Sequence, residues 1–203
     1  MSFSPERLAA LFSRHGLSAE FAAKVFRQLE DAYTSSARYY HNHRHIESLL
    51  KHFDETGVRN DALELAIWFH DFVYDSTRSD NEKQSVEYFM EMLGGILPGD
   101  SSEDVSRLIL ATDPRRPAIT DDEKLISDID LTILSASPQI YGQYTQDIRK
   151  EYSHVSDWAF REGRAAVLQN LLDKPIYQTS FFKCREPLAR QNIQPELAAL
   201  RQI

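Results

Sequence analysis

Apolar side chains recur along the chain at the three- and four-residue spacing of amphipathic helices. The first helix is expected directly after Ser4, a favourable capping residue, with Pro5 at its first position and Leu8, Leu11 and Phe12 on its apolar face. The same spacing predicts a helix that begins at residue 18 and helices over residues 40–56, 61–70, 81–93, 101–110, 121–134, 138–154, 156–172 and 187–200. No segment alternates strictly between apolar and polar residues, so we predict an all-α fold.

The organisation of the chain indicates one domain. Its 203 residues are enough for a single hydrophobic core. The sequence has no internal repeat, no low-complexity tract and no long linker. Residues 115–120, which are rich in Pro and Arg, are the best candidate for an exposed loop. We therefore expect residues 1–203 to form a single helical bundle.

Charge and composition limit the partners and the compartment. A net charge of −8 argues against a nucleic-acid polymer as the main partner, but it leaves room for a small phosphorylated substrate. The single cysteine, Cys184, cannot form an internal disulfide, which favours the reducing cytoplasm. The N-terminus lacks the pattern of a signal peptide, and no apolar run approaches the roughly 18 residues of a membrane span. A homodimer is compatible with such a helical domain, although no apolar seam identifies an interface.

Two histidine clusters carry the candidate chemistry. Residues 41–45 read His-Asn-His-Arg-His, and His70-Asp71 stands where a nearly all-apolar helix is expected to end. Histidine is the commonest neutral metal ligand, and an adjacent carboxylate suits a divalent ion. On a helix, His41 and His45 would project from one face. The two clusters would meet if the helices that carry them pack side by side.

A further carboxylate completes the candidate metal site. Asp130 is followed by Leu131, Ile133 and Leu134, so it is expected in a largely apolar helix. Such a carboxylate is costly to bury unless it is paired or bound to a cation. A single helical histidine is more often a surface or core residue than a ligand, so the metal prediction depends on the combination of these groups.

The pattern Tyr40-His41-Asn42-x-x-His45, then His70-Asp71, then Asp130 resembles the H…HD…D signature of the HD superfamily of metal-dependent phosphohydrolases. Its opening part is also similar to the first signature of cyclic-nucleotide phosphodiesterases, which share the helical core. Other segments resemble a group of small bacterial proteins described as predicted metal-dependent HD phosphohydrolases, namely residues 66–74, 81–85, 111–112, 128–134, 141–144, 148–152, 163–168, 176–177 and 186–192. The resemblance implies a metal-binding core over about residues 35–135, with the helices of residues 138–203 packing on it.

Carried over by position, the resemblance implies that His45, His70, Asp71 and Asp130 bind one divalent metal ion. His41 would then donate a proton to the leaving oxygen, although which of His41 and His45 binds the metal stays open. A set of two His and two Asp suits Mn, Mg, Zn, Fe, Co and Ni alike. Two-metal HD proteins usually carry further histidines before the last Asp, and this chain has none there, so we favour one metal.

Two more acidic residues are candidates for catalysis. Asp128 is two residues from Asp130 and is expected to hydrogen-bond a metal ligand or a bound water. Glu82 follows the His-Asp segment and is a candidate general base. Its alternative role is that of a solvated glutamate in the first turn of a helix, where the helix dipole favours a negative charge.

The remaining candidates concern the substrate. Arg44, Arg149 and Arg164 are candidate phosphate contacts because a guanidinium binds phosphate in a bidentate manner, and a salt bridge or surface position is the alternative for each. Tyr74 is expected to line the pocket. We expect a phosphohydrolase that acts on a nucleotide or a related small phosphate ester or anhydride through a metal-activated water. The alternative is a non-catalytic sensor module that binds a metal or a nucleotide, although retention of every expected ligand speaks against it.

Overall fold

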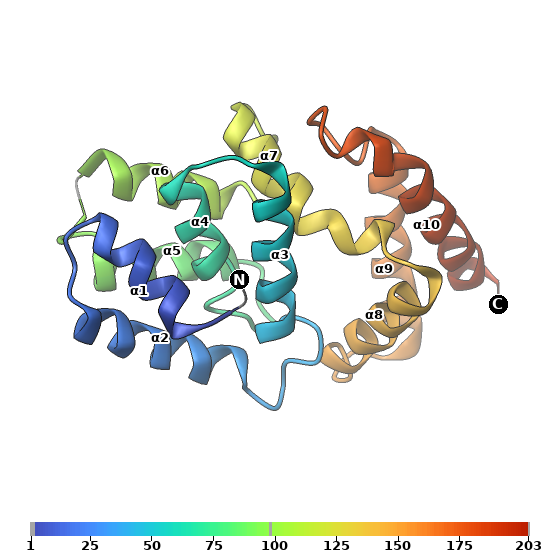
Figure 1. Cartoon of the computed structure of the whole chain (residues 1–203). Coiled ribbons are helices and arrows are strands. Elements are labelled where there is room, and N and C mark those ends of the chain that lie inside the picture. The colour runs from blue at the N-terminus through green and yellow to red at the C-terminus, as the bar shows by residue number, and fades with distance from the viewer. Residues whose placement is uncertain (1–2, 98, 203) are drawn as a thin grey trace.

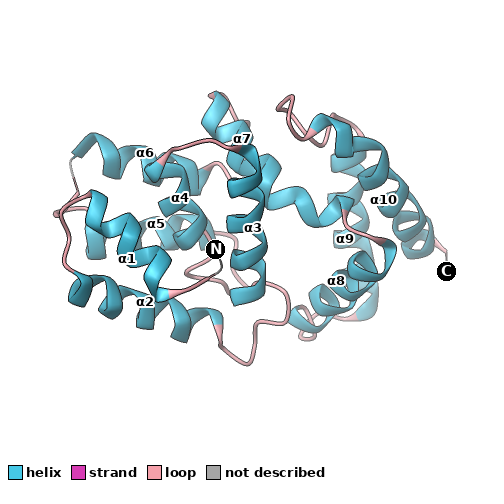
Figure 2. Ribbon diagram, in the orientation of Figure 1, coloured by secondary structure: helices cyan, strands magenta, loops and turns pink. Residues whose placement is uncertain are grey.

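The computed structural model describes residues 3–97 and 99–202, and in this part of the chain it contains helices and no strand (Figures 1 and 2). The all-α prediction is confirmed. The elements are α1 (Pro5–Arg14), α2 (Ala19–Tyr33), α3 (His43–Thr56), α4 (Asp61–Phe69), α5 (Asn81–Leu93), α6 (Gly99–Leu110), α7 (Asp121–Asp130), η1 (Leu131–Ser135), α8 (Pro138–Glu151), α9 (Asp157–Leu172), η2 (Lys183–Arg185) and α10 (Glu186–Arg201).

Capping side chains explain where several helices begin and end. The Ser4 and Ser18 hydroxyls accept hydrogen bonds from backbone N–H groups in the first turns of α1 and α2, as their positions in the sequence predict. Thr120 and Glu123 form a reciprocal capping box at the start of α7. Gly57 ends α3 with a φ of 70°, a left-handed conformation that glycine adopts without steric cost.

Helix α4 lies at the centre of the N-terminal part of the molecule, where α3, α5, α6 and α7 pack around it (Figure 1). Its apolar residues from Leu63 to Phe69 are at most 1% exposed. Helices α8, α9 and α10 gather at the other end of the molecule (Figure 1). The short segment η1 packs against α7, α8 and α10, so it joins the two groups of helices. None of the described helices combines the length and the apolar character that a membrane span requires.

Two boundaries differ from the sequence prediction and affect the site. The predicted helix 40–56 begins only at His43, because the Asn42 side chain caps it by accepting a hydrogen bond from the backbone N–H of Arg44. His41 therefore lies in the preceding loop and does not share a helical face with His45. The predicted helix 121–134 ends as an α-helix at Asp130 and continues as the tighter helix η1.

Candidate metal centre

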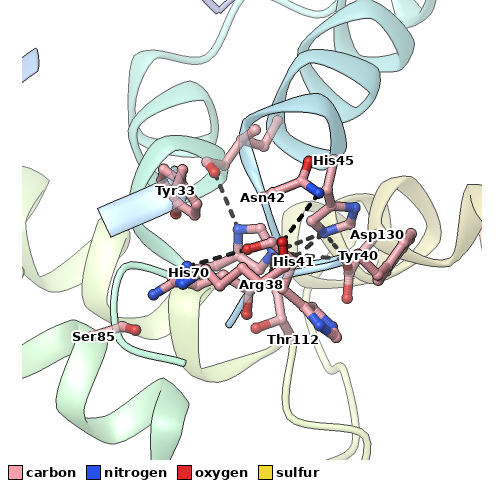
Figure 3. Close-up of polar contacts among 12 residues, drawn as sticks. Tyr33, Arg38, Tyr40, His41, Asn42, His45, His70, Ser85, Thr112 and Asp130 are labelled. Carbon is pink, nitrogen blue, oxygen red and sulfur yellow. Dashed lines mark hydrogen bonds and ion pairs between the residues drawn. The ribbon is translucent and has the colours of Figure 1, made fainter. Parts of the chain in front are cut away.

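Three ionisable side chains meet between α3, α4 and α7 (Figure 3). His45 lies in the first turn of α3, His70 follows the last residue of α4, and Asp130 ends α7. The His45 Nε2 atom is 3.4 Å from His70 Nε2 and 3.2 Å from Asp130 Oδ1. The two imidazoles are almost completely buried, and the Asp130 side chain is 25% exposed. These groups could hold a metal ion, as the sequence predicts.

Asp71 brings a fourth candidate donor atom, and a second carboxylate, close to the two imidazoles. Its Oδ2 atom lies 3.1 Å from His70 Nε2 and 3.6 Å from His45 Nε2. Donor atoms that surround one ion at bonds of about 2.1 Å are themselves about 3.0 to 3.4 Å apart. The distances from each carboxylate to the two imidazoles are close to the spacing that a single divalent ion requires, and the mixture of imidazole nitrogen and carboxylate oxygen suits such an ion.

The orientation of His70 is fixed by the protein backbone. The Nδ1 atom lies 3.1 Å from the carbonyl oxygen of Ile67, which is a hydrogen bond if Nδ1 carries the proton. That tautomer leaves the Nε2 lone pair directed at Asp71 and Asp130, where a metal ion would lie. In the metal-free site, burial opposes protonation of His70, but the charges of Asp71 and Asp130 outweigh burial and raise its pKa well above the usual value.

We expect the metal-free protein to lose stability as the pH rises above neutrality. The pKa of His70 is raised above its ordinary value of 6.5 in the folded state, so its protonated ring stabilises the fold fully below about pH 6.5, and this contribution is lost as the pH rises through the folded-state pKa. A bound divalent ion replaces that proton and again supplies positive charge to offset the carboxylates of Asp71 and Asp130.

Chemical unfolding between about pH 6 and pH 9, with chelator and with added metal, measures this effect. The stabilisation by metal should grow with pH because protons and metal compete for His70. A metal-free protein that gains stability over the same range would contradict the assignment.

His41 stands beside the cluster in a fixed orientation. Its Nδ1 atom is 2.7 Å from Glu151 Oε2, and the other Glu151 oxygen accepts hydrogen bonds from the backbone N–H groups of Tyr40 and His41. The imidazole also stacks on Tyr74, with ring centroids 3.9 Å apart. Burial lowers the pKa of His41, but Asp71 and Glu151 outweigh this and raise it above the usual value. The ring is therefore suited to carry a proton beside the candidate metal site.

Arg38 is a functional candidate that the sequence prediction missed. It donates hydrogen bonds to the carbonyl oxygens of His41, Asp71 and Phe72, at 3.3, 2.6 and 2.7 Å. One guanidinium thus ties the loop of His41 to the turn that carries Asp71. Glu151 was part of a motif in the resemblance but had no predicted role. Because both residues act on partners distant in sequence, no local pattern pointed to them.

A pocket of about 660 Å³ opens onto the cluster and extends between η1, α8 and α9. Of the residues predicted for the site, those that line it are His41, His70, Asp71, Tyr74, Glu82, Asp130 and Arg164. Burial, together with the charges of Asp113 and Asp71, raises the pKa of Glu82 above its usual value. Arg164 is already engaged, because it forms an ion pair with Glu196 at 2.8 Å and donates to the Tyr144 hydroxyl.

The structure does not bring Arg44 or Arg149 to this pocket. Arg44 is exposed on the outer side of α3. Arg149 donates hydrogen bonds to the carbonyl oxygens of Tyr152 and Val155 and pairs with Asp157, so it holds the turn after α8. The alternative of a surface or salt-bridge role therefore describes both arginines.

Asp128 also lies away from the cluster, which corrects its predicted contact with a ligand. Its carboxylate accepts hydrogen bonds from the backbone N–H groups of Gln178 and Thr179 and from the Thr179 hydroxyl, at 2.6 to 2.8 Å. On an α-helix, residues two apart point to nearly opposite sides, so Asp128 and Asp130 cannot serve the same site. Asp128 anchors the loop before η2.

We expect Asp128→Ala to lower the free energy of unfolding while metal content stays that of the wild type. The substitution leaves the N–H groups of Gln178 and Thr179 without their acceptor, and hydrogen bonds to a charged group contribute about 1.5–3 kcal/mol. Urea unfolding and elemental analysis measure the two quantities. Loss of metal from a variant that is still folded would show that Asp128 contributes to the metal site.

Comparisons with known proteins found no similar protein. The chain matches no protein-family model, no curated protein and no solved structure.

Proposed function

We propose that this protein is a metal-dependent phosphohydrolase of the HD type that its sequence resembles. The observation that carries the proposal is the convergence of His45, His70 and Asp130 beside a large pocket, with Asp71 at 3.6 and 3.1 Å from the two imidazoles. A divalent ion held by these residues supplies a water of lowered pKa and polarises a phosphoryl oxygen. The substrate would be a phosphate ester or anhydride, including nucleotides.

The proposed roles of the neighbouring residues follow from their positions. His41 holds a proton on the pocket side of its ring and gives it to the leaving oxygen, while Glu151 keeps the ring in place. Glu82 faces the same pocket, and its raised pKa suits a group that takes a proton from the attacking water. Arg38 holds the His41 loop against the turn at Asp71.

Removal and return of the metal test this proposal directly. We expect the purified protein to contain about one equivalent of a divalent ion, and chelation to abolish hydrolysis of phosphate esters. Returning Mn, Mg, Zn, Fe, Co or Ni one at a time should restore the activity and identify the metal. Binding of a nucleotide without any turnover would favour the sensor module instead. Absence of metal even after addition of these ions would refute the hydrolase and leave a helical binding module.

A further inference from the structure

Helix α9 has an apolar side that lies along the pocket and is only partly covered by the core. Among its described residues only Leu168 is fully buried, although the helix is rich in apolar side chains. Phe160, Gly163, Val167 and Leu171 recur at three- and four-residue spacing, so they lie along one side of the helix. All four line the pocket that three of the candidate metal ligands, His70, Asp71 and Asp130, also line. Val167 is 49% exposed there, although it is aliphatic.

Gly163 makes this wall recessed. Its backbone is that of an ordinary helix, and a Cβ atom built on it would meet no described atom within 4 Å. Neither backbone strain nor close packing therefore requires glycine, which is unfavourable inside a helix. The effect of the missing side chain is to leave room in the pocket beside Val167.

The opposite side of the pocket is also apolar. Ile133 and Leu134 of η1, Ile148 of α8 and Val155 of the following turn line it. Figure 1 shows that η1, α8 and α9 lie together at the end of α7, the helix that carries Asp130. An apolar chamber is thus continuous with the candidate metal centre.

Most of the positive charge in the pocket is already neutralised. Three arginines line it, and each pairs with a carboxylate within 2.8 Å, namely Arg78 with Asp80, Arg115 with Asp113 and Arg164 with Glu196. Lys174 is exposed at the far end of the α9 wall, beyond the helix itself. A chain of phosphates would meet few available cations near the metal centre, whereas a single phosphoryl group needs little more than the ion.

We propose that the substrate is a phosphate monoester of a large apolar alcohol, with its phosphoryl group at the metal centre and its apolar group against Gly163 and Val167. This inference rests on the proposed function. In the reaction, water gives a proton to Glu82 as its oxygen forms a bond to phosphorus, the ester P–O bond breaks, and the leaving oxygen takes a proton from His41. The products are inorganic phosphate and the free alcohol.

Binding of alkylphosphonates, which lack the hydrolysable ester bond, tests the inference independently of turnover. Calorimetry with the metal-loaded protein should show affinity rising from methyl- to butyl- to octylphosphonate, by about threefold to fourfold per methylene until the chain fills the pocket. We expect octylphosphonate to bind at least about a hundredfold more tightly than methylphosphonate.

Two variants of α9 locate the effect. Gly163→Leu fills the recess and should weaken octylphosphonate at least tenfold without changing methylphosphonate. Ala166→Leu adds the same side chain at an exposed position outside the pocket and should change neither ligand. Metal content and thermal unfolding verify that both variants are intact.

The outcomes separate this inference from the proposed function. If methylphosphonate does not bind the metal-loaded protein at all, the proposed function fails. If the three phosphonates bind with equal affinity, or if Gly163→Leu leaves octylphosphonate unaffected, this inference alone is overturned. A nucleoside monophosphate that binds more tightly than octylphosphonate would overturn it in favour of the nucleotide expected from the sequence.

Discussion

Asp71→Ala is expected to leave a folded protein that hydrolyses phosphate esters about a thousandfold more slowly than the wild type. The Asp71 carboxylate approaches both His70 and His45, so its removal takes one of four donors from the ion. Metal ions contribute several kcal/mol to transition states of this kind, and about 4 kcal/mol corresponds to three powers of ten in rate. The backbone carbonyl of Asp71, which Arg38 holds, is unchanged by the substitution.

Steady-state kinetics measure the loss of hydrolysis, and elemental analysis of the same preparations measures the loss of metal that we expect with it. Asp128→Ala is the matched control, because it removes a buried carboxylate that is engaged elsewhere and should retain both metal and turnover. Helix content by circular dichroism should be the same in all three proteins. An Asp71→Ala variant that turns over at the wild-type rate would refute the proposed metal centre.

His41→Ala is expected to keep its metal and to slow hydrolysis of alkyl phosphates by about a hundredfold to ten-thousandfold. His41 lies outside the group of donor atoms formed by His45, His70 and Asp130, but it lines the same pocket. An alkoxide is a poor leaving group and needs a proton, whereas p-nitrophenolate leaves without one. The variant should therefore lose much less activity on p-nitrophenyl phosphate than on an alkyl phosphate.

Glu151→Gln separates positioning from proton donation. The amide keeps the size of the side chain but removes the negative charge that holds the His41 ring and favours its protonated form. We expect a smaller loss than in His41→Ala, again concentrated on poor leaving groups, with the pH profile of kcat moved to lower pH. Loss of metal from His41→Ala would make His41 a ligand and would reverse the assigned roles of His41 and His45.

Most of the helices could be predicted from the sequence because residues at or near each helix end determine its boundaries. Ser4, Ser18 and Thr120 cap the helices that follow them, and the apolar spacing marks which side of each helix is buried. The candidate metal donors were also predictable in part, because a His-Asp pair at the end of an apolar helix places both groups at one point. Helix α4 has this pattern, and its position at the centre of the fold follows from its apolar residues.

The contacts that complete the site could not be predicted in this way. Asn42 was part of the H…HD…D pattern, but it caps α3, so the helix begins after His41. Asp128 has an apolar setting much like that of Asp130, yet it pairs with a loop some 50 residues away in the chain. Arg149 was a candidate phosphate contact with a salt bridge as its alternative, and it holds the turn after α8. Each of these outcomes depends on a partner that only the folded chain brings near.

The two halves of the site come from separate stretches of the sequence, which has a consequence for how such a protein can diversify. The candidate metal donors all lie at or before residue 130, whereas α9 begins only at residue 157. A mutation at Gly163 or Val167 can therefore change which molecules fit the pocket while the candidate metal ligands stay unchanged. Related proteins could acquire different substrates by drift in one helix, while selection preserves the older chemistry.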